Sequence, residues 1–183
     1  MLDLSGYTVN DALHSGSRTA VYRATRDHDG LPVVLKTPRS AQPSTIEAAR
    51  LAAEYQIGRA IDDDGIVRVL GLEQQRRPAL VLEDFGGRAL SETLARGPLE
   101  LDEFLDLSAR LSLAVHELHR RGVTHKDINP SNVIHNPRTG AIKLADLSIA
   151  SVLESEQVRT SDPGVMEGTL SYMSPEQIGR AHV

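Results

Sequence analysis

The segment from His125 to Asn132 reads HKDINPSN, and Asp146 follows fourteen residues after its last member. The Asp127 carboxylate and the Asn132 amide lie five residues apart in an expected loop, and an expected hairpin over residues 133–144 leads to Asp146. These three groups can converge on one point, where Asp127 would orient a hydroxyl group and the other two would hold Mg²⁺. The alternative is that Asp, Asn and Pro only build turns here.

A pair of charged residues lies upstream, in the strand-rich first part of the chain. Lys36 ends the extended segment PVVLK at residues 32–36, and Glu54 follows eighteen residues later on a predicted helix. Taken alone, Lys36 would be a strand-end cation whose stem packs on apolar surface, and Glu54 a solvated helix charge. Taken one at a time, neither residue therefore indicates a function.

A third pattern lies downstream, where residues 168–176 read GTLSYMSPE. Together these segments resemble the protein kinase family. HKDINPSN resembles the catalytic loop H-R-D-x-x-x-x-N, and Asp146 resembles the metal-binding aspartate of D-F-G. Lys36 resembles the lysine of V-A-I-K, and SPE at residues 174–176 resembles the A-P-E motif. The landmarks follow the family's order from residue 7 to residue 176.

The resemblance implies an enzyme that transfers the γ-phosphoryl group of ATP to Ser or Thr hydroxyls of a protein substrate. It makes Asp127 the catalytic residue that accepts or orients the hydroxyl proton. Lys36, paired with Glu54, would position the phosphates, and Asn132 and Asp146 would be the metal ligands.

The resemblance also implies a nucleotide site, with ATP and Mg²⁺ as the expected cofactors. It assigns Gly16 and Val21 to the loop that covers the phosphates and to the strand after it, and Lys36 to the α- and β-phosphates. The backbone from Glu83 to Phe85 would supply hydrogen bonds to adenine.

The expected fold is α+β and protein-kinase-like, with two lobes in a partial kinase domain over residues 1–177. A complete small lobe of about residues 7–85 would hold one helix between Ser44 and Ile61. Its five antiparallel strands are expected near residues 7–14, 19–25, 31–36, 66–72 and 79–82. An incomplete helical large lobe of about residues 88–177 would follow the linker Phe85-Gly86-Gly87. It should contain one long helix over about 102–121, with an apolar face from Phe104 to Leu118, and a tail from residue 146 that is mostly loop.

The sequence also departs from the family pattern. The phosphate-covering loop reads HSGSRTAV at residues 14–21 and keeps only the central glycine, Gly16. Asp146 is followed by Leu147 and Ser148 instead of Phe and Gly, and Asn129 stands where many kinases have a lysine near the transferred phosphate. These departures favour an alternative function, a pseudokinase or nucleotide-sensing interaction module. A small-molecule phosphotransferase is a further alternative, but the segment GTLSYMSPE argues for protein substrates.

The residues of three motifs narrow the resemblance to one group of kinase domains. HKDINPSN, LEDFGG at residues 82–87 and MSPEQ at 173–177 are similar to the N-terminal kinase domains of large signalling proteins that carry AAA-type ATPase, GAF and sensor histidine kinase modules. Further signalling domains are therefore expected to follow in the full-length protein. Residues 178–183 leave the family pattern and match one reading frame of a sequencing adapter. We expect them to be a non-native tail, and the fragment itself to be poorly active.

Composition limits the partners. Twenty Lys and Arg residues against twenty-five Asp and Glu residues give a net charge of −5, without a basic block, so a nucleic-acid partner is not expected. The chain has no cysteine, which fits a reducing compartment. No run approaches the roughly 18 apolar residues that span a bilayer, so we expect a cytoplasmic protein without a membrane partner.

Overall fold

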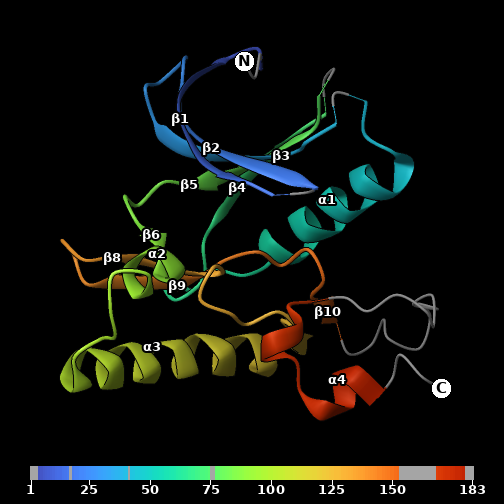
Figure 1. Cartoon of the computed structure of the whole chain (residues 1–183). Coiled ribbons are helices and arrows are strands. Elements are labelled where there is room, and N and C mark those ends of the chain that lie inside the picture. Colours follow the sequence, from blue (N-terminus) through green and yellow to red (C-terminus); the bar gives the residue numbers. More distant parts are fainter. Residues whose placement is uncertain (1–3, 17, 41, 75–76, 153–167, 180–183) are drawn as a thin grey trace. The chain divides into compact units, whose positions relative to one another are not determined.

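The computed structural model of the chain describes residues 4–16, 18–40, 42–74, 77–152 and 168–179 (Figure 1). The chain forms two compact units. The first consists of Met1–Asp62 and Val67–Gly86, and the second of Asp63–Ile66 and Gly87–Val183. The division therefore falls inside the expected linker Phe85-Gly86-Gly87.

The first unit is built on a five-stranded antiparallel sheet with the strand order β1-β2-β3-β5-β4. The strands are β1 (Tyr7–Ser15), β2 (Thr19–Arg26), β3 (Pro32–Pro38), β4 (Val69–Glu73) and β5 (Ala79–Glu83). One helix, α1 (Thr45–Gly58), lies against β4 and β5 (Figure 1). The expected sheet and helix of the small lobe are thus confirmed.

The start of α1 is fixed by a capping box. The Ser44 hydroxyl accepts a hydrogen bond from the Glu47 N–H at 3.3 Å, and the Glu47 carboxylate accepts one from the Ser44 N–H at 2.8 Å. The Ser44 N–H and hydroxyl hold the pKa of Glu47 below its usual value, because both donate to the charged form. The predicted helix start at Ser44 is therefore correct.

The sheet of the first unit curls around an aliphatic core. Ala24, Val33, Leu35, Ala79 and Val81 form a cluster in which each residue is no more than 1% exposed. The two edge strands, β1 and β4, approach each other at one point. There the hydroxyl of Tyr7 on β1 donates to the carboxylate of Glu73 on β4 at 2.9 Å. Burial and the Glu73 carboxylate raise the pKa of Tyr7 to about 12.

The second unit combines helices with short strands. Its described residues contain the helices α2 (Leu90–Leu94), α3 (Leu101–Arg120) and α4 (Pro175–Gly179) and a 3₁₀ turn at Leu170–Tyr172. One small sheet has the order β6-β8-β9, formed by β6 (Arg88–Ala89), β8 (Val133–Asn136) and β9 (Ala141–Leu144). A second pairs β7 (Val123–Thr124) with β10 (Ser151–Val152).

Helix α3 ends as its sequence predicts. The Gly122 N–H donates to the carbonyl of His119 at 2.9 Å, and Gly122 has a φ of 70°, a left-handed conformation that glycine adopts without a Cβ clash. Leu107 and Leu118 are buried, as the apolar face requires, but Phe104 at the start of that face is 52% exposed. The predicted face is therefore covered from Leu107 onward, and Phe104 at its start is not.

Two boundaries and the character of the tail differ from the prediction. Strand β4 begins at Val69 and not at Ile66, because Ile66 instead forms a parallel bridge with Leu144 in the second unit. Helix α1 ends at Gly58, before Ile61. The tail after residue 146 is less irregular than expected, because its described parts, residues 146–152 and 168–179, contain β10, the 3₁₀ turn and α4.

Candidate active site

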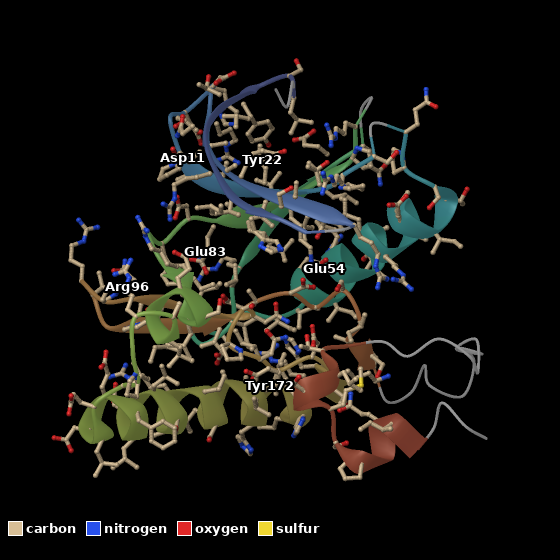
Figure 2. All side chains as sticks on the ribbon, in the orientation of Figure 1. Asp11, Tyr22, Glu54, Glu83, Arg96 and Tyr172 are labelled. Carbon is tan, nitrogen blue, oxygen red and sulfur yellow. The ribbon has the colours of Figure 1, made fainter. Side chains whose placement is uncertain are left out.

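In the first unit, Lys36 on β3 and Glu54 on α1 form a buried ion pair. The Lys36 Nζ lies 2.9 Å from Oε1 and 2.8 Å from Oε2 of Glu54. The two side chains are only 6% and 4% exposed, and Figure 2 shows Glu54 on α1. A buried ion pair contributes little net stability, because desolvation offsets much of the attraction between the charges. Stability alone therefore gives little reason for the pair.

Replacement of Lys36 by Met is expected to destabilise the chain by about 3 kcal/mol, because the buried Glu54 carboxylate loses its counter-ion. The double variant Lys36→Met/Glu54→Leu should recover most of that stability, since no uncompensated charge remains. Urea unfolding followed by circular dichroism measures both values. Equal stability of the single variant and the parent protein would contradict a buried pair.

The other residues assigned to nucleotide binding also lie in the first unit. Val21 on β2 is directly paired with Lys36 on β3, so the two side chains share one face of the sheet. The Gly16 N–H donates to the carbonyl of Thr19 at 2.9 Å, which closes the turn between β1 and β2. Glu83, labelled in Figure 2, is the last residue of β5. Phe85 follows it after one residue.

In the second unit, the 125–132 loop is organised around the buried ring of His125, which is 1% exposed. The Asp127 N–H donates to Nδ1 of this ring at 3.2 Å. Nε2 therefore carries the proton and donates to the carbonyl of Ala145 at 3.0 Å. The ring thus connects the loop that contains Asp127 to the residue before Asp146.

The carboxylate of Asp127 is held by two donors. Asn132 Nδ2 donates to Asp127 Oδ2 at 3.0 Å, and the Thr169 N–H donates to Asp127 Oδ1 at 2.9 Å. Asn132 Nδ2 also donates to the Asp127 carbonyl at 2.8 Å. Among the described residues, both hydrogen bonds of the Asn132 amide use its nitrogen, so its oxygen Oδ1 is the atom left for another ligand.

Asp146 lies close to this group through the backbone. The N–H of Ala145 donates to the Asn132 carbonyl at 2.8 Å, and Asp146 Oδ1 accepts from the Ser148 N–H at 3.1 Å. In the described part of the chain, the non-glycine residues with positive φ are Lys126, at 69°, and Asp146, at 67°. Each such conformation costs roughly 1 kcal/mol or more, and strained backbone of this kind clusters at functional sites.

Sequence reasoning missed several contacts that fix this group. The side chain of Asn129, 6% exposed, donates to the Thr169 hydroxyl at 3.1 Å and accepts from the Ser131 N–H at 2.9 Å. Gln177 Nε2 donates to the carbonyl of the strained Lys126 at 2.9 Å. The kinase resemblance also places Thr169 opposite the catalytic aspartate, and its N–H does donate to Asp127 Oδ1. Thr160 and Ser161 are loop hydroxyls that the sequence offers as phosphorylation candidates, and both lie outside the described residues.

The structure therefore gathers the predicted residues into two groups. Asp127, Asn132 and Asp146 lie together in the second unit, and Lys36 and Glu54 in the first. Among the described residues, no group of three or more His, Asp or Glu side chains could hold a metal ion by itself. In the same part of the chain, no helix combines the length and the apolar character needed to cross a membrane.

Comparison with known proteins identifies the family of the chain. The family model of the protein kinase domain matches residues 7–183, so the chain belongs to the protein kinase family. The serine/threonine-protein kinase PknA of Mycobacterium tuberculosis is 32% identical over 95% of this chain and 42% of its own length. The DNA damage-responsive serine/threonine-protein kinase RqkA of Deinococcus radiodurans is 32% identical over 93% of this chain and 26% of its own. The chain thus spans less than half the length of these relatives.

Proposed function

We propose that this chain is the ATP-dependent catalytic domain, or part of it, of a serine/threonine protein kinase. The observation that carries the proposal is the carboxylate of Asp127, held on both oxygens by Asn132 and by the Thr169 N–H. Membership of the protein kinase family and the relatives' description as serine/threonine kinases support the same function.

In the proposed reaction, Asp127 accepts the proton of a Ser or Thr hydroxyl on a protein substrate. The hydroxyl oxygen forms a bond to the γ-phosphorus of ATP as the bond from that phosphorus to the bridging oxygen of ADP breaks. The two hydrogen bonds to Asp127 fix its orientation, and each carboxylate oxygen keeps a second lone pair for the incoming hydroxyl.

We assign the metal-binding role to Asn132 and Asp146, and the metal to Mg²⁺. Their donor set fits a small hard cation, because it consists of one amide oxygen and one carboxylate. Two protein ligands are too few to enclose the ion, so phosphate oxygens and water would complete its coordination. Bound Mg²⁺ would neutralise negative charge on the β- and γ-phosphates during transfer.

The remaining predicted residues would bind the nucleotide. Lys36, immobilised by Glu54, would contact the α- and β-phosphates, and Gly16 and Val21 would belong to the phosphate-covering loop and the strand that follows. The backbone from Glu83 to Phe85 would bind adenine. The shared face of Val21 and Lys36 supports this assignment.

The full-length protein is proposed to carry further signalling modules of the AAA-type ATPase, GAF and histidine kinase classes. The residues of the motifs HKDINPSN, LEDFGG and MSPEQ support this domain organisation. The greater length of the relatives is compatible with it. Sequencing the gene downstream of codon 177 tests it. A reading frame that continues through the remaining kinase helices into such modules is the expected result, and one that stops after Val183 would contradict it.

The test of the proposed function is transfer of label from γ-³²P-labelled ATP, with Mg²⁺, to casein and to the chain itself, followed by phosphoamino-acid analysis. Labelled phosphoserine or phosphothreonine is expected from the parent protein and not from Lys36→Met/Glu54→Leu, which controls for contaminating kinases. If the parent binds Mg·ATP but transfers no label, the pseudokinase alternative is favoured. That alternative draws on the single glycine of the loop at residues 14–21 and on Leu147-Ser148.

A further inference from the structure

A second ion pair in the first unit has no role in the proposed mechanism. Arg23 on β2 binds Asp84, the residue directly after β5, with Nε 2.6 Å from Oδ2 and Nη2 3.4 Å from Oδ1. The Arg23 side chain is 24% exposed and that of Asp84 only 8%. A carboxylate this well buried needs a compensating cation.

The arginine reaches Asp84 across the sheet. Arg23 is paired with Val34 on β3, and Val34 is paired with Leu82 on β5, so these three side chains share one face. Val21, two residues before Arg23 on the same strand, lies on that face as well, together with its partner Lys36. The ion pair therefore lies on the face that carries the residues assigned to the nucleotide.

Asp84 also fixes the backbone that follows it. Its Oδ1 accepts a hydrogen bond from the Gly86 N–H at 2.8 Å, and Gly86 has a φ of 75°, which a residue with a side chain rarely adopts. One carboxylate thus connects β2 to the 84–86 turn and closes that turn. Glu83 and Phe85, the residues assigned to adenine, flank Asp84 on either side.

We propose that Arg23 is a positioning residue for adenine recognition, acting through Asp84 on the backbone of Glu83 and Phe85. This inference rests on the proposed function, since it requires that adenine binds this backbone. Rotation of the peptide groups around Asp84 would displace both flanking residues together. A displacement of about 1 Å is enough to weaken a positioned contact strongly.

Arg26 offers a matched control on the same strand. Its side chain is 25% exposed, nearly the same as that of Arg23, and it also binds an aspartate at 2.6 Å, but its partner Asp29 lies in the turn between β2 and β3. Arg23→Met and Arg26→Met therefore remove similar ion pairs, and only the first removes one that contacts the 84–86 turn.

The test measures binding of Mg·ATP and Mg·GTP by calorimetry, and amide exchange over residues 83–87 in the nucleotide-free protein. Arg23→Met is expected to weaken ATP binding roughly tenfold and to lower the preference for ATP over GTP, because only the base contacts depend on the turn. Exchange at Phe85 and Gly86 should become faster. Arg26→Met should leave all three measurements unchanged.

Two conservative variants keep the test decisive if Arg23→Met unfolds. Asp84→Asn retains an oxygen for the Gly86 N–H but loses the charge, and should reproduce the loss of ATP preference. Arg23→Lys retains the positive charge and should keep part of the preference for ATP that Arg23→Met loses. Unchanged ATP preference and exchange in Asp84→Asn and in any folded Arg23 variant would overturn the inference while leaving the kinase proposal intact. A parent protein that binds no nucleotide would instead overturn both, beginning with the proposed function.

Discussion

Replacement of Asp127 by Asn is expected to reduce the rate of phosphoryl transfer roughly 10³-fold, within the range usual for loss of a general base. Asn cannot accept the hydroxyl proton. It also has only one side-chain oxygen, so it can satisfy either Asn132 Nδ2 or the Thr169 N–H, whereas the aspartate satisfies both. Affinity for Mg·ATP should stay within a few-fold of the parent value, because Asp127 acts on the hydroxyl and not on the nucleotide.

Label transfer under single-turnover conditions and calorimetry on the same preparations separate these two effects. Asp106→Asn is the matched control, since Asp106 is a 59% exposed carboxylate on α3 that pairs with Arg110. This control should transfer phosphate at the parent rate. Equal turnover of Asp127→Asn and the parent would remove Asp127 from the catalytic role.

Replacement of Asp146 is expected to weaken nucleotide binding itself, because in the proposed mechanism Asp146 would hold the metal ion that accompanies ATP. Asp146→Asn is the cleaner variant, since Asn tolerates the φ of 67° and can still accept from the Ser148 N–H. Affinity for ATP in the presence of Mg²⁺ should fall by roughly 10- to 100-fold, the usual effect of disturbing a metal site. The affinity of Asp146→Ala for ATP should fall at least as far.

Calorimetric titration with ATP is carried out once in the presence of Mg²⁺ and once in EDTA. Comparing the two affinities distinguishes a metal effect from a general loss of the site. In EDTA the parent and Asp146→Asn should bind ATP with similar affinity, since neither then holds the ion. Unchanged affinity of the variant in Mg²⁺ would favour a metal-independent pseudokinase.

The sequence predicted the elements that carry the candidate site well, because local signals mark them. The strands around Lys36 and the hairpin before Asp146 have clear apolar patterns and turn residues, and the capping box at Ser44 marks the start of α1. The resemblance of their motifs to those of protein kinases then suggested which charged residues belong together. The strand, turn and capping signals involve residues that are close together in the chain, so they can be recognised in a single sequence.

The buried side of α1 could not be predicted in the same way. Ile46, Ala49, Ala53 and Ile57 recur at helical spacing, yet Ile46 is 68% exposed, and the buried residues are Leu51, Glu54 and Gly58. The helix is rotated so that a charged residue, Glu54, reaches Lys36. A pattern based on hydrophobicity assigns Glu54 to solvent. The family resemblance suggested its pairing with Lys36, but not that the pair would define the buried side of the helix.

Long-range polar contacts were also beyond sequence reasoning. The contact of His125 with Ala145, that of Asn129 with Thr169 and that of Arg23 with Asp84 join residues separated by 20, 40 and 61 positions. No periodicity links residues at such separations, because the contacts depend on how the strands and loops meet. Asn129 illustrates the consequence. In the sequence, Asn129 stood out only because many kinases have a lysine at this position. In the structure its side chain is buried and hydrogen-bonded to Thr169.

The most direct test of the central claim is a crystal structure of the chain with Mg²⁺ and a non-hydrolysable ATP analogue. We expect Asn132 Oδ1 and an Asp146 carboxylate oxygen to lie about 2.1 Å from the metal, the distance usual for Mg²⁺–oxygen bonds. A Ser or Thr hydroxyl of a bound peptide should lie within hydrogen-bond distance of Asp127. An analogue bound without metal contacts to Asn132 and Asp146, or with Asp127 turned away from the γ-phosphate, would contradict the account.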